Sequence, residues 1–203
     1  MKKCIKMYEN NYKNPVHTGL KELEQFLQLI GDLNEPMELF AMGGTAMVLC
    51  NIKATTKDID FMTTSTQEQM KKLLTLAGLK EHNPSGLCNT WHLGKIRIDL
   101  FYGGYILGVE LPADWKEKSS HVQNIGKVKL HVLNWEDIII TKVARSEPRD
   151  IEDCIDIVKS QKLSLNSIKK RYYSVADTSL ISDYQAKFEA LESGLKHAAN
   201  RAA

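Results

Sequence analysis

Two aspartates one position apart, Asp58 and Asp60, are the residues of this chain whose types and spacing most clearly indicate chemistry. They lie in a strand-like run, where residues i and i+2 face the same side. Both carboxylates therefore project from one face, while Ile59 and Phe61 are buried on the other. A third aspartate, Asp99, follows in a second apolar run. Three converging carboxylates attract a hard divalent cation, Mg²⁺ or Mn²⁺.

A glycine pair, Gly43 and Gly44, precedes the acidic pair, with thirteen residues between Gly44 and Asp58. Glycine permits a tight turn and lets the backbone approach a ligand closely. Each pattern alone is weak, because a lone Asp-x-Asp is usually a solvated strand edge and a lone Gly-Gly is usually a turn. Their order and spacing, with Asp99 on a strand of its own, favour one functional site.

Hydrophobic periodicity and turn residues predict the elements that position these side chains. Residues 19–33 repeat apolar side chains at helical spacing, and residues 37–42 form a short apolar strand that ends at the glycine pair. The acidic pair belongs to a predicted strand over residues 57–63. Further helices are predicted over 45–52 and 66–79, and two closely spaced strands over 90–93 and 95–102.

The pattern changes from strands to helices near Asn134. Residues 103–126 are predicted as mostly loop with one strand over 105–111, and residues 127–133 alternate like a final strand. Helices are predicted over 134–146, 150–160, 165–173 and 179–197. The predicted fold is therefore α/β. A small mixed β-sheet with flanking helices covers residues 1–133, and a C-terminal helical domain covers residues 134–203.

Composition and charge limit the possible classes. At 203 residues the chain suits one domain, or a core with a small appendage. Its formal net charge of +2 creates no global field for a nucleic-acid or membrane partner. The basic residues 1–6 precede no apolar segment, so neither a signal peptide nor a membrane anchor is expected. Four scattered cysteines are expected as reduced thiols of a cytoplasmic protein: Cys4, Cys50, Cys88 and Cys154.

Residues 42–46, Met-Gly-Gly-Thr-Ala, and residues 56–61, Thr-Lys-Asp-Ile-Asp-Phe, resemble the DNA polymerase β-like nucleotidyltransferase superfamily. Within it, the similarity is to the minimal, toxin-like nucleotidyltransferases of the AbiEii type. The superfamily pattern is Gly-Gly or Gly-Ser, a short helix, Asp-x-Asp and a later carboxylate on a neighbouring strand. The resemblance continues through residues 133–142 and 149–153 and covers residues 37–157.

This resemblance implies transfer of a nucleoside monophosphate from a nucleoside triphosphate to a hydroxyl acceptor, with release of pyrophosphate. Asp58 and Asp60 are then expected to bind two metal ions, and Asp99 to help bind the catalytic metal and act as a base. Two metal ions about 4 Å apart stabilise both the attacking and the leaving oxygen. The acceptor stays open as an RNA, a protein or a small molecule.

The resemblance also implies residues that bind the triphosphate. Gly43 and Gly44 are expected to approach it closely, and Thr45 begins a predicted helix whose free N–H groups favour an anion. Lys142 is expected to reach the phosphates, and Asp150 to support the site. Two alternatives stay open: Lys142 extends into water, or Asp150 merely forms a helix-start ion pair with Arg149.

One position departs from the family pattern. Relatives commonly carry an arginine four residues before the first aspartate, where this chain has Ala54. Lys53 or Lys57 is expected to supply the missing charge for nucleotide binding.

Two rival functions remain open. Ala54 and the near-neutral charge favour a non-catalytic nucleotide- or nucleic-acid-binding regulatory module, part of a toxin–antitoxin pair with a cognate toxin or antitoxin as partner. The adjacent Tyr172 and Tyr173, beside the basic residues 169–171, instead suggest a helical surface that stacks on nucleic acid.

Overall fold

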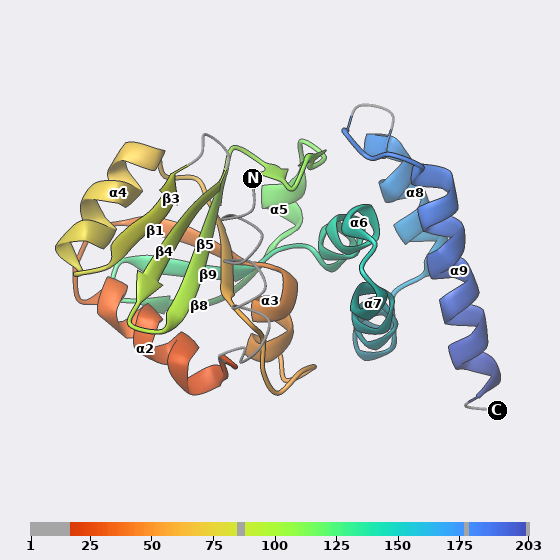
Figure 1. The fold of residues 1–203 in the computed structure, drawn as a ribbon, viewed down its shortest axis with the longest axis horizontal. Coiled ribbons are helices and arrows are strands. Elements are labelled where there is room, and N and C mark those ends of the chain that lie inside the picture. Colours follow the sequence, from red (N-terminus) through yellow and green to blue (C-terminus); the bar gives the residue numbers. More distant parts are fainter. Residues whose placement is uncertain (1–16, 85–87, 177–178, 202–203) are drawn as a thin grey trace, which may run out of the picture.

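The computed structural model describes residues 17–84, 88–176 and 179–201. Cys4 and the basic N-terminal residues, on which two of the expectations above rest, lie outside the described residues. Figure 1 shows a sheet with its helices on one side of the molecule and a group of helices from the second half of the chain on the other. The predicted α/β architecture with a helical C-terminal part is confirmed.

The sheet is mixed and has seven strands in the order β3-β4-β5-β2-β1-β9-β8. Strand β2 lies in its centre, parallel to β5 and antiparallel to β1. This order places the strand that carries the acidic pair directly beside the strand that carries the third aspartate. The strands are β1 Met37–Ala41, β2 Ile59–Thr63, β3 Lys80–Pro84, β4 Cys88–Leu93, β5 Ile96–Tyr102, β8 Ser120–Ile125 and β9 Val128–Val132.

The helices of the sheet domain are α2 Leu20–Gly31, α3 Gly43–Leu49, α4 Gln67–Leu76 and the short α5 Trp115–Lys118. The apolar stripe of α2 is buried as its periodicity predicts, through Leu23, Phe26 and Ile30. Helix α4 begins with a capping box, in which the Thr66 hydroxyl accepts a bond from the Gln69 N–H and the Gln69 side chain accepts one from the Thr66 N–H.

Residues 103–126 differ from the predicted mostly looped segment. They form a small hairpin of β6 Tyr105–Ile106 and β7 Val109–Glu110, then α5, then the edge strand β8. Five of the six residues of β8 are exposed, so its sequence lacks the apolar alternation that identifies a strand. The edge strand β3 was also absent from the predicted elements, and its polar sequence gives the same physical reason.

The tail consists of α6 Trp135–Arg145, α7 Pro148–Gln161, α8 Leu165–Ala176 and α9 Tyr184–Asn200. Pro148 stands in the first turn of α7, where its fixed φ and missing N–H are tolerated. Figure 1 shows α6 next to the sheet domain, with α8 and α9 on the far side of α6 and α7. Helix α6 also contacts α3, so tail and sheet domain meet next to the glycine pair.

A buried ion pair joins the tail helices to each other and to α5. The Arg171 guanidinium donates to both carboxylate oxygens of Asp137, at 2.6 and 2.8 Å, and to Asp114 at 2.8 Å. Tyr172 is fully buried and packs against Phe188. These residues are therefore occupied inside the tail, which argues against the predicted nucleic-acid surface around Tyr172 and Arg171.

In the part of the chain that the structure describes, no helix combines the length and the apolar character needed to cross a bilayer. Cys50, Cys88 and Cys154 are free thiols, as expected from their scattered positions.

Candidate active site

The three predicted carboxylates converge at the centre of the sheet. Asp58 immediately precedes β2, Asp60 is the second residue of β2, and Asp99 on β5 stands directly opposite Asp60 in the parallel register. One carboxylate oxygen from each lies within 4.8 Å of the others. Ile59 and Phe61 are fully buried on the opposite face, as strand alternation requires. This is the donor set that suits a hard divalent cation.

Thr45 fixes the backbone that carries the acidic pair. Its hydroxyl accepts a hydrogen bond from the Asp60 N–H at 2.8 Å and donates to the Asp58 carbonyl at 3.3 Å. The side chain is only 1% exposed. The sequence prediction gave Thr45 a phosphate-binding role at a helix start, whereas its hydroxyl is engaged in positioning the two aspartates.

Each position of the glycine pair requires glycine for a different local reason. Gly43 adopts φ +54°, which favours glycine, and a Cβ atom there would lie 3.2 Å from an Asp60 carboxylate oxygen. A Cβ atom on Gly44 would overlap the Thr56 side chain. Helix α3 begins at Gly43, two residues earlier than predicted, so both glycines belong to its first turn.

Asp99 is held by two residues that the sequence prediction did not assign to the site. Arg97, two positions earlier on the same face of β5, donates to both carboxylate oxygens at 3.1 and 2.7 Å. Thr90, opposite Asp99 on β4, donates through its hydroxyl at 2.7 Å. The i and i+2 spacing of Arg97 and Asp99 was the available signal. Thr90 could be assigned to the site only from the register between β4 and β5.

The acidic cluster repels itself. Burial is the main cause that raises the pKa of Asp60 well above its usual value, and the charges of Asp58 and Asp99 raise it further. Arg145 and Arg97 lower this pKa by less. The pKa of Asp58 is likewise raised by burial and by Asp99. A bound cation would relieve this repulsion, so the donor set fits a divalent metal in charge as well as in atom type.

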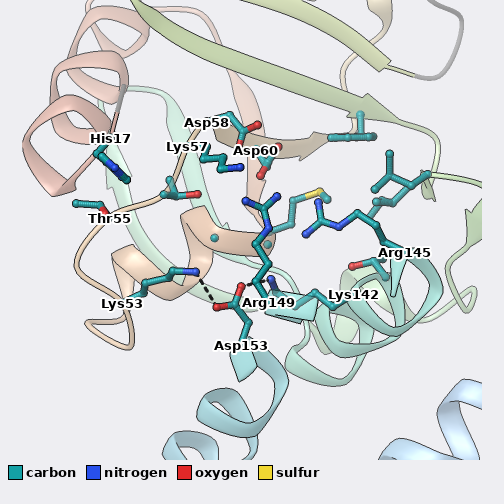
Figure 2. A pocket seen from close by; sticks show the side chains of 18 residues that line it. His17, Lys53, Thr55, Lys57, Asp58, Asp60, Lys142, Arg145, Arg149 and Asp153 are labelled. Carbon is teal, nitrogen blue, oxygen red and sulfur yellow. Dashed lines mark hydrogen bonds and ion pairs between the residues drawn. The ribbon is translucent and has the colours of Figure 1, made fainter. Parts of the chain in front are cut away.

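A cavity of about 240 Å³ lies between the sheet domain and the tail. Asp58 and Asp60 line it from the sheet, together with both glycines of the pair. Figure 2 shows the labelled side chains around it, with Lys142, Arg145 and Arg149 on the side of the acidic pair that faces α6 and α7. Thr45, Asp99 and Asp150 are buried and are absent from the lining.

Lys142 is part of a buried charge network. Its ammonium group donates to Asp153 at 2.6 Å and lies 3.6 Å from Asp150. Lys53, from the loop after α3, donates to the other Asp153 oxygen at 2.7 Å. Lys142 is 3% exposed, so the alternative in which it extends into water is wrong. Asp153 therefore bridges α6, α7 and the sheet domain, a role the sequence prediction missed.

Arg145 is another cation that lines the cavity, and it is not among the site residues predicted from the sequence. It donates to both oxygens of Asp150, at 2.9 and 2.6 Å, so Asp150 pairs with Arg145 and Lys142 rather than with Arg149. Burial is the largest single influence and would raise the pKa of Asp150, but the bonds and charge of Arg145, the charge of Lys142 and a bond from the Glu147 backbone together lower it below its usual value. Arg149 contacts the partly exposed Glu147 at 3.0 Å.

The residues around Ala54 supply several cations to the same cavity. Ala54 itself is exposed, while Lys53, Lys57 and Arg149 line the cavity. In Figure 2 the Arg149 side chain rises from α7 toward Asp58 and Asp60. Its charge also lowers the pKa of Asp58. An arginine from the tail thus lines the cavity that contains the acidic pair.

The fold is similar to that of solved structures of low sequence identity. The crystal structure of ANT(2″)-Ia in complex with adenylyl-2″-tobramycin superposes with a TM-score of 0.55 and 16% identity, over 75% of this chain and 94% of that chain. The solution structure of the antibiotic-resistance factor ANT(2″)-Ia gives a TM-score of 0.54 and 14% identity, over 86% and 98%. At these identities the likeness concerns the fold alone. The curated proteins contain no match to this chain.

A family profile matches residues 18–201, which include the glycine pair, the three carboxylates and the tail network. Its description, nucleotidyltransferase of unknown function, agrees with the superfamily expected from the sequence motifs. The chain therefore belongs to the DUF6036 family of nucleotidyltransferases of unknown function.

Proposed function

We propose that this protein transfers a nucleoside monophosphate from a nucleoside triphosphate to a hydroxyl acceptor in a metal-dependent reaction. The observation that carries the proposal is the cluster of Asp58, Asp60 and Asp99 beside a cavity that is lined with lysines and arginines. Carboxylates bind the cations, and the basic side chains complement the phosphates. Both halves of a metal–triphosphate site thus stand next to each other.

In this reaction Asp58, Asp60 and Asp99 hold Mg²⁺ or Mn²⁺. The metal supplies charge stabilisation to the attacking and leaving oxygens. Thr45 keeps the two β2 carboxylates in position through its bonds to their backbone. Arg97 and Thr90 orient Asp99, which accepts the proton of the attacking hydroxyl. The hydroxyl oxygen forms a bond to the α-phosphorus, and the bond to the bridging oxygen breaks as pyrophosphate leaves.

The triphosphate lies between the glycine pair and the tail cations. Gly43 and Gly44 let the backbone approach the phosphates, and Lys57 lines the cavity as well. Arg149 takes over the role of the arginine that relatives carry in place of Ala54. Lys142 is paired with the buried Asp153 and Asp150, whereas the partner of Arg149, Glu147, is partly exposed to solvent, so Lys142 adds less net charge to the cavity than Arg149. We assign Asp150 to positioning Arg145 and Lys142.

A second candidate is a nucleotide-binding regulatory module without transferase activity. The two bonds from Arg97 to Asp99 favour it, because the guanidinium engages both carboxylate oxygens and competes with a metal ion for them. This candidate predicts nucleotide affinity without transfer of the α-phosphate.

Labelled transfer separates the two candidates. The protein is incubated with Mg²⁺, a cell extract and each nucleoside triphosphate labelled at the α-phosphate, with γ-labelled nucleotide as a negative control. Transfer predicts an acceptor that gains α-label in wild type and in Asp156→Asn, an exposed control on α7, but not in Asp60→Asn. Nucleotide binding by calorimetry without label transfer supports the regulatory module, and absence of nucleotide binding contradicts both.

The AbiEii-type likeness of the motifs favours a role in a toxin–antitoxin pair in the cytoplasm, with a cognate toxin or antitoxin as partner. Growth arrest on expression of the wild type, absent with Asp60→Asn, is the expected sign of a toxin. Equal growth of both strains would contradict the toxin role, while leaving the transfer reaction to the labelling experiment.

A further inference from the structure

An exposed leucine stands at the mouth of the cavity, on the hairpin between β6 and β7. Leu107 is 60% exposed and lines the cavity together with Ile106 and Phe101. Leu180, which is 90% exposed, comes from the segment before α9 and is tied to the hairpin by a bond from its N–H to the Gly108 carbonyl at 3.0 Å. We refer to Leu107 and Leu180 as the apolar lip.

Leu107 occupies a backbone position that leucine disfavours. Ile106 pairs with Val109, so Leu107 and Gly108 form a two-residue hairpin loop, with φ values of +50° and +86°. Such loops prefer Asn, Asp or Gly at the first position, because a larger side chain is strained at positive φ. A leucine here costs conformational energy and leaves most of its apolar surface in water. A strained backbone position whose side chain lines a cavity indicates a functional contact.

The cavity lining places Leu107 on the β5 side of the acidic pair, because Phe101, two residues after Asp99 on β5, lines the cavity together with Leu107. Strands β1 and β5 flank β2 on opposite sides. The glycine pair follows β1, whereas the β6–β7 hairpin follows β5 and its aspartate Asp99. In an in-line displacement the attacking and leaving oxygens stand on opposite sides of the phosphorus. If pyrophosphate leaves toward the glycine pair, the attacking hydroxyl arrives from the side of Asp99 and Leu107.

The lip offers little charge to an acceptor. Residues 105–110 contain one charged residue, Glu110, and residues 179–181 contain none. A polyanion such as RNA is normally held by lysine and arginine along its backbone. The lip instead complements a nonpolar, uncharged surface.

We propose that the acceptor hydroxyl is carried on a nonpolar framework, and that Leu107 selects this acceptor by contacting the nonpolar surface next to the hydroxyl. The proposal rests on the proposed transferase function and names the acceptor class for that same site. During transfer the acceptor oxygen bonds to the α-phosphorus, pyrophosphate leaves with the electron pair of the broken bond, and the hydroxyl proton passes to Asp99.

Leu107→Asn separates function from folding. Asparagine tolerates positive φ, so the variant is expected to melt at the same temperature as wild type or about 2 °C higher, whereas acceptor binding is weakened. Leu107→Met keeps an apolar side chain and is expected to keep acceptor binding. Leu76→Asn, at an exposed leucine on α4, is the matched control.

The test measures binding to protein that is saturated with Mg²⁺ and with whichever α,β-methylene nucleoside triphosphate analogue binds. Leucine methyl NMR then follows titration with N-acetyl-tyrosinamide, whose hydroxyl sits on a nonpolar ring, and with N-acetyl-serinamide, which lacks that ring. The first probe is expected to shift the Leu107 methyl signals and to bind at least about tenfold more weakly to Leu107→Asn, the loss expected for about 1.4 kcal/mol of apolar contact. Serinamide is expected to bind no more tightly to wild type than to this variant.

Three results would overturn the inference: no saturable binding of the tyrosine probe, equal binding of both probes, or unchanged affinity in Leu107→Asn. Binding of a short RNA that survives this substitution would assign the acceptor to nucleic acid and also overturn it. Failure of every nucleotide analogue to bind would instead contradict the proposed function itself, and the acceptor class with it.

Discussion

Two groups of charged residues meet in this molecule, and they are built in opposite ways. At the centre of the sheet, Asp58 and Asp60 stand beside Asp99, and burial and mutual repulsion raise the pKa of the first two. In the tail, buried charges are matched: Arg171 binds Asp137 through two bonds.

The tail pairs stabilise one arrangement of helices, because each charge has its partner within the protein. The carboxylate cluster contains like charges that its own surroundings balance only in part, which costs stability in the absence of a ligand. The difference teaches which charges to interpret as structural and which as functional. A buried cluster of like charges, whose members repel one another, is balanced only when a ligand of opposite charge binds.

The largest expected effect is the loss of transfer on removing one carboxylate of the cluster. Asp60→Asn is expected to lower the transfer rate by about 10³-fold, because a metal contributes several kcal/mol to the transition state. Folding is expected to be unimpaired. Activity within tenfold of wild type, measured by α-label transfer at equal protein concentration, would show that the carboxylate cluster is not required for transfer. It would thus contradict the contrast between the two groups.

Breaking the tail ion pair between Arg171 and Asp137 is expected to have the reverse outcome, a loss of stability. Arg171→Ala leaves Asp137 buried without its main partner and is expected to lower the free energy of unfolding by about 3–5 kcal/mol. Urea denaturation measures the loss. Lys170→Ala, at the exposed neighbouring position on α8, is the control and is expected to change little.

The double variant Asp137→Leu/Arg171→Leu sharpens this prediction. Because it removes both charges, it is expected to recover most of the stability lost in Arg171→Ala. A double variant as unstable as Arg171→Ala would show that packing of the arginine, and not its charge pairing, holds the helices together.

Addition of metal is expected to stabilise the protein through the carboxylate cluster alone. Mg²⁺ at 100 times its dissociation constant is expected to add about 2.7 kcal/mol to the free energy of unfolding. Differential scanning fluorimetry with and without a chelator detects this. Arg171→Ala is expected to keep the metal-induced shift, and Asp60→Asn to lose most of it. Equal shifts in both variants would point to a cation site elsewhere.

The smallest expected effect is on the pH dependence of the metal-free protein. The pKa of Asp60 is higher in the folded than in the unfolded state, so its neutral form favours folding. This contribution is full below the unfolded pKa and is lost as pH rises through the folded pKa. At neutral pH, metal-free Asp60→Asn is thus expected to be more stable than wild type, by about 2–4 °C in Tm per kcal/mol of relieved repulsion. The prediction would be contradicted if the Tm of Asp60→Asn were lower than that of wild type at pH 7, and by the same amount at pH 3.5.

Much of the fold was predictable because buried elements leave periodic sequence patterns. The apolar run before the glycine pair and the alternation around Asp58 and Asp60 identify β1 and β2. The exposed edge strand β8 and the polar β3 do not, because a strand that is paired at an edge and solvated needs no apolar alternation.

The site was predictable as far as the motifs reach along the chain. The convergence of the three aspartates follows from the superfamily pattern, and the structure brings them within 4.8 Å. The partners of Asp99 and Lys142 depend on contacts between distant segments, such as Thr90 across the β4–β5 register and Asp153 across two helices. The spacing of residues along one sequence does not encode such contacts. For the same reason the sequence predicts that Thr45 binds the phosphates, whereas its hydroxyl bonds to the backbone of the acidic pair.

Manganese binding tests the central claim most directly, since Mn²⁺ substitutes for Mg²⁺ at carboxylate sites and has a distinct magnetic resonance signal. The stoichiometry of bound Mn²⁺ is measured by electron paramagnetic resonance in the presence of a nonhydrolysable nucleotide analogue. We expect two ions per wild-type chain, retained in Asp156→Asn and lost in Asp60→Asn. No bound ion in wild type, or the same stoichiometry in Asp60→Asn, would contradict it.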